Sequence, residues 1–258
     1  MANILEVKNV SKSFAGIRAC ESATLSVTQG SVTSIIGPNG AGKTSLFNLI
    51  SGAITADSGS IIFNGTEISK KRPHEISRLG LIRTFQGAKV IKRLTVLDNI
   101  LLAAQDNPGE HLWRVLTPRV RKAFEKEAEE KALDLLKQVG LETFTQKLAG
   151  NLSGGQRKLL DLARAMMANP SMLLLDEPFA GVNPALVEKL VEVLQSLRAH
   201  HDLTFLLVEH DLETVMNISD QVFVMAQGTV IASGLPQSIY ENEVVIDAYL
   251  GSRRKSAS

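Results

Sequence analysis

The chain has 258 residues and a formal net charge of +1, so its overall charge does not indicate nucleic acid or an anionic membrane surface as a partner. A hydrophobic fraction of 44% is enough for a substantial core, in one large domain or two small ones. The single cysteine, Cys20, excludes an internal disulfide, and no apolar run approaches the roughly 20 residues that cross a bilayer.

Short runs of apolar and β-branched residues predict strands along the chain. They are Ile4–Val7, Leu25–Val27, Val32–Ile36, Ile61–Phe63, Met172–Leu175, Phe205–Val208, Val222–Met225 and Val230–Ala232. The runs at 172–175 and 205–208 are continuously apolar, which is typical of parallel strands covered by helices on both faces. The early runs are separated by glycines and predict an antiparallel sheet on the N-terminal side. The expected fold class is therefore α/β.

A glycine-rich loop of the form G-x-x-x-x-G-K-T follows the third of these runs. Its residues are Gly37, Pro38, Asn39, Gly40, Ala41, Gly42, Lys43 and Thr44. With a strand before it and helical spacing after it, the loop predicts a phosphate cradle formed by backbone N–H groups. Lys43 would neutralise the β and γ oxygens, and the Thr44 hydroxyl would ligate Mg²⁺. The alternative is a glycine-rich turn that binds nothing.

The segment 88–167 is mostly helix-forming and differs in character from the residues on either side of it. We expect it to be a helical subdomain inserted into an α/β core formed by 1–87 and 168–258. Its charge-rich stretch, 119–138, is interpreted as a solvated helix face, with a partner surface as the alternative.

A second candidate phosphate cradle lies at Leu152-Ser153-Gly154-Gly155-Gln156, before a helix predicted over 156–167. A helix N-terminus carries unpaired N–H groups and a partial positive charge, and glycines let an anion approach the backbone. The alternative is an ordinary capping box, because Ser153 and Gln156 have the S-x-x-Q spacing. Two cradles in one chain predict a nucleotide site assembled from two surfaces.

Three polar residues follow apolar strands and are candidates for hydrolysis chemistry. Asp176 ends the run 172–175, where a carboxylate can hold Mg²⁺, with a helix cap as the alternative. Glu177 comes next and is a candidate general base or orienter of the attacking water, rather than only a solvated carboxylate. His210 follows the run 205–208 and can donate a hydrogen bond to a γ-phosphate, although a lone histidine is more often structural.

The two cradles together resemble the ATP-binding subunits of ABC transporters, and other motifs of that family follow in order. The resemblance implies a P-loop NTPase core with a mostly parallel sheet, an antiparallel β subdomain and an inserted helical subdomain. Asp176 and Glu177 then resemble the Walker B pair and His210 the switch histidine. The family match makes Gln86 the Q-loop glutamine, which contacts Mg²⁺ or water. It places Phe14 against adenine, and the alternative for Phe14 is an aromatic side chain of the core beside a strand.

Two further segments are similar to the importer ATPases for branched-chain amino acids. They are Glu177–Pro184 and Asp247–Gly251. The D-loop, Gly181-Val182-Asn183, departs from the commonest family form, which has Asp where this chain has Asn183. ATPases for lipopolysaccharide export and for urea import look much alike and remain alternatives, as does a soluble ABC ATPase that acts on nucleic acid or ribosomes.

The resemblance also implies cofactors, partners and location. The expected function is transport-coupled ATP hydrolysis with ATP and Mg²⁺, at the cytoplasmic face of the cell membrane. Expected partners are a second ATP-binding subunit (identical or paralogous), integral-membrane permease subunits and, indirectly, a solute-binding protein, but no nucleic acid. In this family Ser153 and Gly155 would complete the ATP site of the opposite subunit. Lys89–Leu94 is the expected docking surface for the membrane partner, with ordinary packing within the helical subdomain as the alternative.

Overall fold

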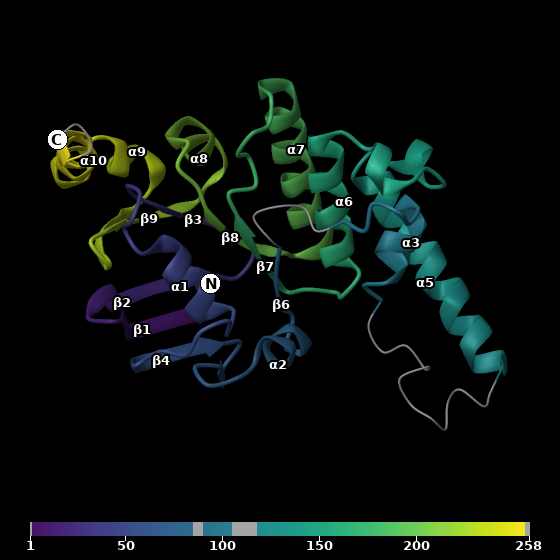
Figure 1. The fold of residues 1–258 in the computed structure, drawn as a ribbon, viewed down its shortest axis with the longest axis horizontal. Coiled ribbons are helices and arrows are strands. Elements are labelled where there is room, and N and C mark those ends of the chain that lie inside the picture. Colours follow the sequence, from purple (N-terminus) through teal and green to yellow (C-terminus); the bar gives the residue numbers. More distant parts are fainter. Residues whose placement is uncertain (1, 85–89, 105–117, 256–258) are drawn as a thin grey trace. The chain divides into compact units, whose positions relative to one another are not determined.

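The computed structural model, drawn in Figure 1, describes residues 2–84, 90–104 and 118–255. These residues fall into two compact units. The first unit comprises Met1–Arg83, Ser171–Ala180 and Arg198–Ser258. The second comprises Thr84–Pro170 and Gly181–Leu197. The predicted domain boundaries after residues 87 and 167 stay a prediction.

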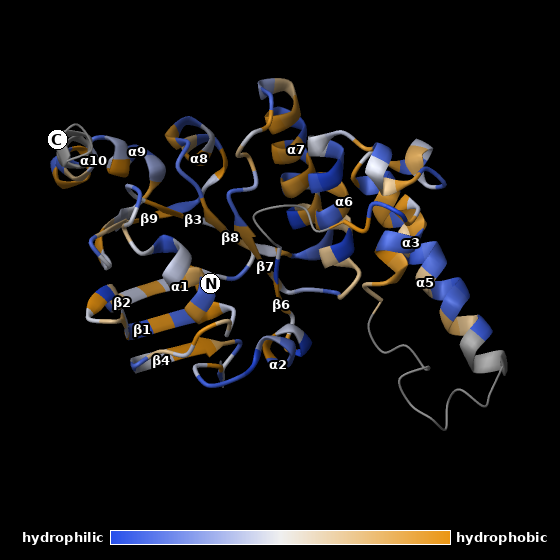
Figure 2. Ribbon diagram, viewed as in Figure 1, coloured by the Kyte–Doolittle hydropathy of each residue, from blue (hydrophilic) through white to orange (hydrophobic). Residues whose placement is uncertain are grey.

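The first unit is built around a mostly parallel sheet with the strand order β10-β9-β3-β8-β7-β6. Its strands are β3 (Val32–Ile36), β6 (Leu81–Arg83), β7 (Met172–Asp176), β8 (Thr204–Val208), β9 (Gln221–Ala226) and β10 (Thr229–Gly234). Only β10 pairs antiparallel, with β9. Every residue of β3, β7 and β8 is buried, as the continuously apolar runs predicted for β7 and β8. Figure 2 shows the hydrophobic colour along β8.

A second, antiparallel sheet of the first unit has the order β2-β1-β4-β5. Its strands are β1 (Asn3–Phe14), β2 (Ile17–Thr28), β4 (Ser58–Phe63) and β5 (Thr66–Glu67). Helix α1 (Lys43–Ile50) shares one apolar cluster with both sheets, through residues such as Phe47, Phe63 and Leu206. The antiparallel sheet expected on the N-terminal side is confirmed.

The remaining helices of the first unit are α2 (Pro73–Arg78), α8 (Leu212–Ile218), α9 (Pro236–Tyr240) and α10 (Glu243–Lys255). A second apolar cluster joins β3 and β9 to α8, α9 and α10 through Ile36, Val215, Val224, Ile239 and Val245. The parallel sheet is therefore packed against helices through this cluster as well as through α1.

The second unit is helical in its described residues. It contains α3 (Val96–Leu101), α5 (Pro118–Gln138), the 3₁₀ turns η2 (Glu142–Phe144) and η3 (Ala149–Asn151), and α6 (Gly154–Met166). Helix α7 (Pro184–His201) begins in this unit and ends in the first. Figure 2 shows a mostly hydrophilic α5. None of the helices in 2–84, 90–104 and 118–255 is long and apolar enough to span a membrane.

Candidate active site

The glycine-rich loop is the turn between β3 and α1, and its glycines adopt backbone conformations that other residues avoid. Gly37, Gly40 and Gly42 have φ values of 148°, 79° and 99°. A Cβ atom at Gly37 would lie 2.0 Å from the carbonyl oxygen of Met225, and one at Gly42 would lie 2.3 Å from that of Ala19. Backbone strain and close packing therefore both require glycine at positions 37 and 42.

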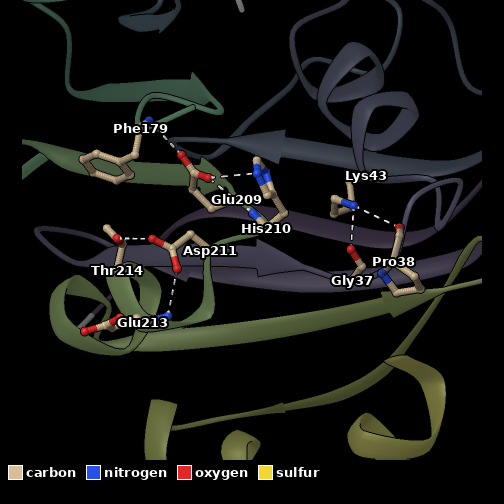
Figure 3. A network of polar contacts seen from close by, with 9 residues as sticks. All are labelled: Gly37, Pro38, Lys43, Phe179, Glu209, His210, Asp211, Glu213 and Thr214. Carbon is tan, nitrogen blue, oxygen red and sulfur yellow. Dashed lines mark hydrogen bonds and ion pairs between the residues drawn. The ribbon is translucent and has the colours of Figure 1, made fainter. Parts of the chain in front are cut away.

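The loop presents an open helix N-terminus beside an ammonium group. Gly42 caps α1 without a side-chain hydrogen bond, and the first turn of α1 carries no acidic residue. The Nζ of Lys43 donates to the carbonyl oxygens of Gly37 (2.7 Å) and Pro38 (3.0 Å), which holds it across the loop (Figure 3). Backbone N–H groups, the helix dipole and the ammonium together suit an anion such as a polyphosphate.

Charge complementarity links this loop to the carboxylates at the end of β7. Burial lowers the pKa of the Lys43 ammonium, while the charges of Glu177 and Asp176 act to raise that pKa. The structure therefore brings Lys43, Asp176 and Glu177 within electrostatic reach of one another, although they are more than 130 positions apart in the sequence.

Asp176 is buried and paired with an arginine that the sequence analysis did not identify. Its side chain is 5% exposed, and its Oδ2 accepts a hydrogen bond from Nη2 of Arg83 at 2.8 Å. The other end of the guanidinium donates to Asn48 Oδ1 (2.6 Å) and Ser51 Oγ (3.1 Å), in and just after α1. Arg83 thus ties the β7 carboxylate to the helix that begins at the phosphate loop. The available sequence signal was a charged residue ending the short apolar run at 81–82.

The oxygen donors near the loop fit Mg²⁺. Thr44 has an exposed hydroxyl-bearing side chain in the first turn of α1, and the Asp176 carboxylate carries a second oxygen beside the one that accepts from Arg83. The described residues contain no group of three or more His, Cys, Asp or Glu side chains that could hold a metal. A site of one carboxylate and one hydroxyl is what Mg²⁺ uses when phosphate oxygens and water supply its other ligands.

Glu177 begins a tight turn directly after β7. Its φ of 48° is in the left-handed region, which costs a residue with a side chain on the order of 1 kcal/mol. The Glu177 N–H donates to the carbonyl of Val208 at 2.9 Å, and the Glu177 carbonyl accepts from Ala180 N–H at 3.2 Å. The turn therefore holds a partly buried carboxylate in a conformation that the surrounding hydrogen bonds maintain.

His210 follows β8 and is exposed, with 57% of its side chain accessible to solvent. The residue before it, Glu209, is 1% exposed and was not singled out from the sequence. Glu209 Oε2 accepts the backbone N–H of His210 at 3.2 Å, and it lies 3.8 Å from His210 Nδ1 (Figure 3). The only sequence signal for Glu209 was a charged residue directly after a continuously apolar strand.

The second cradle lies in the helical unit and forms a complete capping box. Ser153 Oγ accepts the N–H of Gln156 at 3.2 Å, and Gln156 Oε1 accepts the N–H of Ser153 at 2.9 Å. The capping box is confirmed, but the helix begins at Gly154 rather than at 156, because the cap residue is Ser153.

The two glycines after Ser153 have different surroundings. A Cβ at Gly155 would lie 1.6 Å from Leu186 Cδ2, whereas a Cβ at Gly154 would have no heavy atom within 4 Å. Gly155 is therefore needed for packing between α6 and α7, and Gly154 leaves the helix N-terminus open. Contact of this segment with a nucleotide stays a prediction.

Phe14 and Asn183, two further residues of the predicted motifs, lie in the part of the chain that the structure describes. Phe14 ends β1 with 45% of its surface exposed, and Lys12 Nζ lies 5.6 Å from the centroid of its ring. Asn183 Oδ1 accepts the N–H of Leu186 at 3.0 Å, so Asn183, the D-loop residue that replaces the commoner Asp, caps α7. Gln86 lies outside the described residues.

Comparison with known proteins agrees with this geometry. The family model for ABC transporters matches residues 20–180. The probable branched-chain amino acid transport ATP-binding protein LivG of Archaeoglobus fulgidus is 44% identical over 250 residues, which cover 97% of this chain and 96% of that protein. The high-affinity branched-chain amino acid transport ATP-binding protein BraF of Pseudomonas aeruginosa is 41% identical, over 96% of this chain and 98% of that protein.

Solved structures give the same result for the fold. The crystal structure of the ADP conformation of an ATP-binding cassette of an ABC transporter matches with a TM-score of 0.84 and 36% identity, covering 97% of this chain and all of that one. A nucleotide-free cassette matches with a TM-score of 0.82 and 36% identity over 96% of this chain. The chain therefore belongs to the ABC transporter family, as one of its ATP-hydrolysing cassette subunits.

Proposed function

We propose that this ATPase energises an ABC importer for branched-chain or similar amino acids. The observation that carries the proposal is the phosphate loop with Lys43 in electrostatic reach of Asp176 and Glu177. The named substrate class comes from the relatives, which are branched-chain amino acid transport ATP-binding proteins. This chain matches them over nearly their whole length. Lipopolysaccharide export and urea import remain the alternatives for the solute.

The site residues have separate roles in the proposed hydrolysis. The backbone N–H groups of the loop 37–44, in which Pro38 has none, and the Lys43 ammonium bind and neutralise the β- and γ-phosphates. Thr44 and Asp176, with Gln86, would hold Mg²⁺, which supplies charge neutralisation at the same oxygens when it is bound. Glu177 orients the attacking water or takes its proton, and His210 donates a hydrogen bond to the γ-phosphate.

Each ATP site requires two subunits in this proposal. Ser153, Gly154, Gly155 and Gln156 form an open helix N-terminus that would face the γ-phosphate held by the opposite subunit, which is identical or paralogous. Phe14, exposed at the end of β1, would stack on adenine. A monomer should therefore bind ATP but hydrolyse it poorly.

The proposed docking surface for a membrane-embedded permease is Lys89–Leu94, of which residues 90–94 are described. Ile91 is 45% exposed and lies between Val90 and Lys92. The buried Asn99 fixes its backbone, accepting from Ile91 N–H at 2.8 Å and donating to its carbonyl at 3.0 Å. A rigid segment with an exposed apolar side chain suits a partner surface. We place the subunit at the cytoplasmic face of the cell membrane, with a solute-binding protein as an indirect partner.

The role of Glu177 is tested by steady-state ATP hydrolysis of Glu177→Gln. A neutral amide of the same size keeps the turn but loses the basic oxygen, so we expect the rate to fall at least a hundredfold while ATP still binds. Glu213→Gln is the matched control, because Glu213 is an exposed carboxylate on α8. An unchanged rate in Glu177→Gln would refute the proposed role.

The transport function is tested by purification from membranes and by reconstitution. We expect an integral-membrane partner to co-purify with the chain, and Ile91→Asp to weaken that association. The reconstituted complex should then take up branched-chain amino acids, and it should transport neither urea nor lipids. Recovery without any membrane partner would argue strongly against a transporter subunit.

A further inference from the structure

Glu209 is a buried carboxylate for which the proposed hydrolysis provides no role. It follows β8 at the centre of the parallel sheet, where its backbone N–H donates to the carbonyl of Ile35 in β3 at 3.2 Å. It is 1% exposed. Burial raises the pKa of this carboxyl, and the backbone N–H groups of Phe179 and His210 oppose that rise. Burying a carboxylate is costly unless it is hydrogen-bonded, so its contacts identify what it stabilises.

The two oxygens of Glu209 bind two different loops. Oε1 accepts the backbone N–H of Phe179 at 2.9 Å, and Oε2 accepts the backbone N–H of His210 at 3.2 Å. Figure 3 shows the side chain between the two donors, with the His210 ring beside it. Phe179 belongs to the turn that begins at Glu177, and the Glu177 N–H is itself bonded to Val208, the residue before Glu209. One side chain therefore joins the loop of Glu177 to the loop of His210.

We propose that Glu209 is a positioning residue for ATP hydrolysis, which sets the relative placement of Glu177 and His210 through these two backbone hydrogen bonds. The inference rests on the proposed roles of those two residues. A carboxylate suits this task because both of its oxygens are acceptors, whereas a glutamine amide has one acceptor and would direct its NH₂ at the other N–H donor. Glu209→Gln therefore releases one loop with almost no change in size.

The discriminating experiment measures kcat and KM for ATP in the full-length chain. In Glu209→Gln we expect kcat to fall about a hundredfold, the penalty that a displacement of about 1 Å in the reacting groups can impose. KM for ATP and the affinity for ADP should stay within about twofold, because Lys43 and the phosphate loop make no hydrogen bond with Glu209. Glu213→Gln, a neutralised carboxylate four positions away, should hydrolyse ATP normally.

A direct measure of the hydrogen bond accompanies the kinetics. In the chain labelled with ¹⁵N-phenylalanine, the Phe179 amide, assigned by its loss in Phe179→Leu, should be protected from exchange in the wild type. In Glu209→Gln this amide should lose that protection where the new NH₂ group faces Phe179, and should shift markedly where the NH₂ group faces His210 and Phe179 keeps an amide oxygen as its acceptor. If the variant does not fold, the wild-type exchange rate alone still tests the geometry, and an unprotected Phe179 amide would overturn the inference.

The kinetic outcomes separate the inference from the function on which it rests. Normal kcat in Glu209→Gln, with hydrolysis abolished in Glu177→Gln, would overturn the positioning role alone. Normal kcat in both variants would overturn the role of Glu177 as well. Loss of ADP binding in Glu209→Gln would show general damage to the site and would also overturn the positioning role.

Discussion

Gly155→Ala is expected to destabilise the helical unit, because Gly155 lies where α6 meets Leu186 of α7. A Cβ at position 155 would lie 1.6 Å from Leu186 Cδ2, 2.7 Å from Cγ and 3.3 Å from Cδ1. Rotating the end of the leucine moves both methyl groups but leaves Cγ in place, so χ1 must change or the helices must separate. Overpacking of this kind costs about 1–3 kcal/mol, and the involvement of Cγ favours a value of about 2 kcal/mol.

Urea unfolding followed by circular dichroism measures this cost, with two companion variants. Gly154→Ala is the matched control: its Cβ meets no heavy atom within 4 Å, so its unfolding free energy should be unchanged or higher by up to about 1 kcal/mol. Adding Leu186→Ala to Gly155→Ala should remove the clash, so the double variant should be more stable than the sum of the single changes by at least about 1 kcal/mol. Wild-type stability in Gly155→Ala, or strict additivity in the double variant, would refute the packing argument.

Three further predictions concern other parts of the site. Ser153→Asp keeps an acceptor for the Gln156 N–H, so the unfolding free energy should change by less than about 0.5 kcal/mol. The rate of ATP hydrolysis should fall at least tenfold, because the added negative charge would face the γ-phosphate held by the opposite subunit. An unchanged rate would contradict the two-subunit site. Arg83→Met leaves the buried Asp176 unpaired and should cost about 3 kcal/mol in urea unfolding, whereas a loss below about 1 kcal/mol would mean that the pair is dispensable. Burial raises the pKa of the Cys20 thiol from the ordinary 9.0 to about 11. Iodoacetamide at pH 8 should therefore alkylate this thiol at least about a hundredfold more slowly in the folded chain than in urea. Equal alkylation rates in the folded and unfolded chain would show an accessible thiol.

The strands that were easiest to predict are those whose burial is visible in their own residues. β7 and β8 are continuously apolar, and both proved fully buried. β3 was harder, because Thr33 and Ser34 interrupt the apolar run although both are fully buried. The hydroxyl of Ser34 is satisfied by Ser219 at 2.6 Å, a partner 185 positions away. No local pattern can reveal such a partner, because it is set by the parallel pairing of β3 with β9.

Strand β6 was missed for a related reason. At three residues, Leu81–Arg83, it is too short to show a period, and its last residue is charged. What stabilises Arg83 there is Asp176, 93 positions further along the chain. The glycines of the phosphate loop were different, because their positive φ values are required by the loop itself and leave a direct signature in the sequence.

Arg83 and Glu209 illustrate which functional residues sequence motifs do not reveal. Sequence motifs are made of residues whose side chains contact a ligand. These two charged residues lie at or just after strand ends, and their side chains hydrogen-bond to other parts of the protein instead. A buried charge costs free energy unless it is paired, so the hydrogen-bond partners of each residue show which part of the site it stabilises. On the proposed assignment, Arg83 fixes the metal-binding Asp176 and Glu209 fixes the turn that begins at Glu177. Substitution at the first should therefore weaken the binding of Mg²⁺-ATP, and substitution at the second should slow hydrolysis without affecting binding.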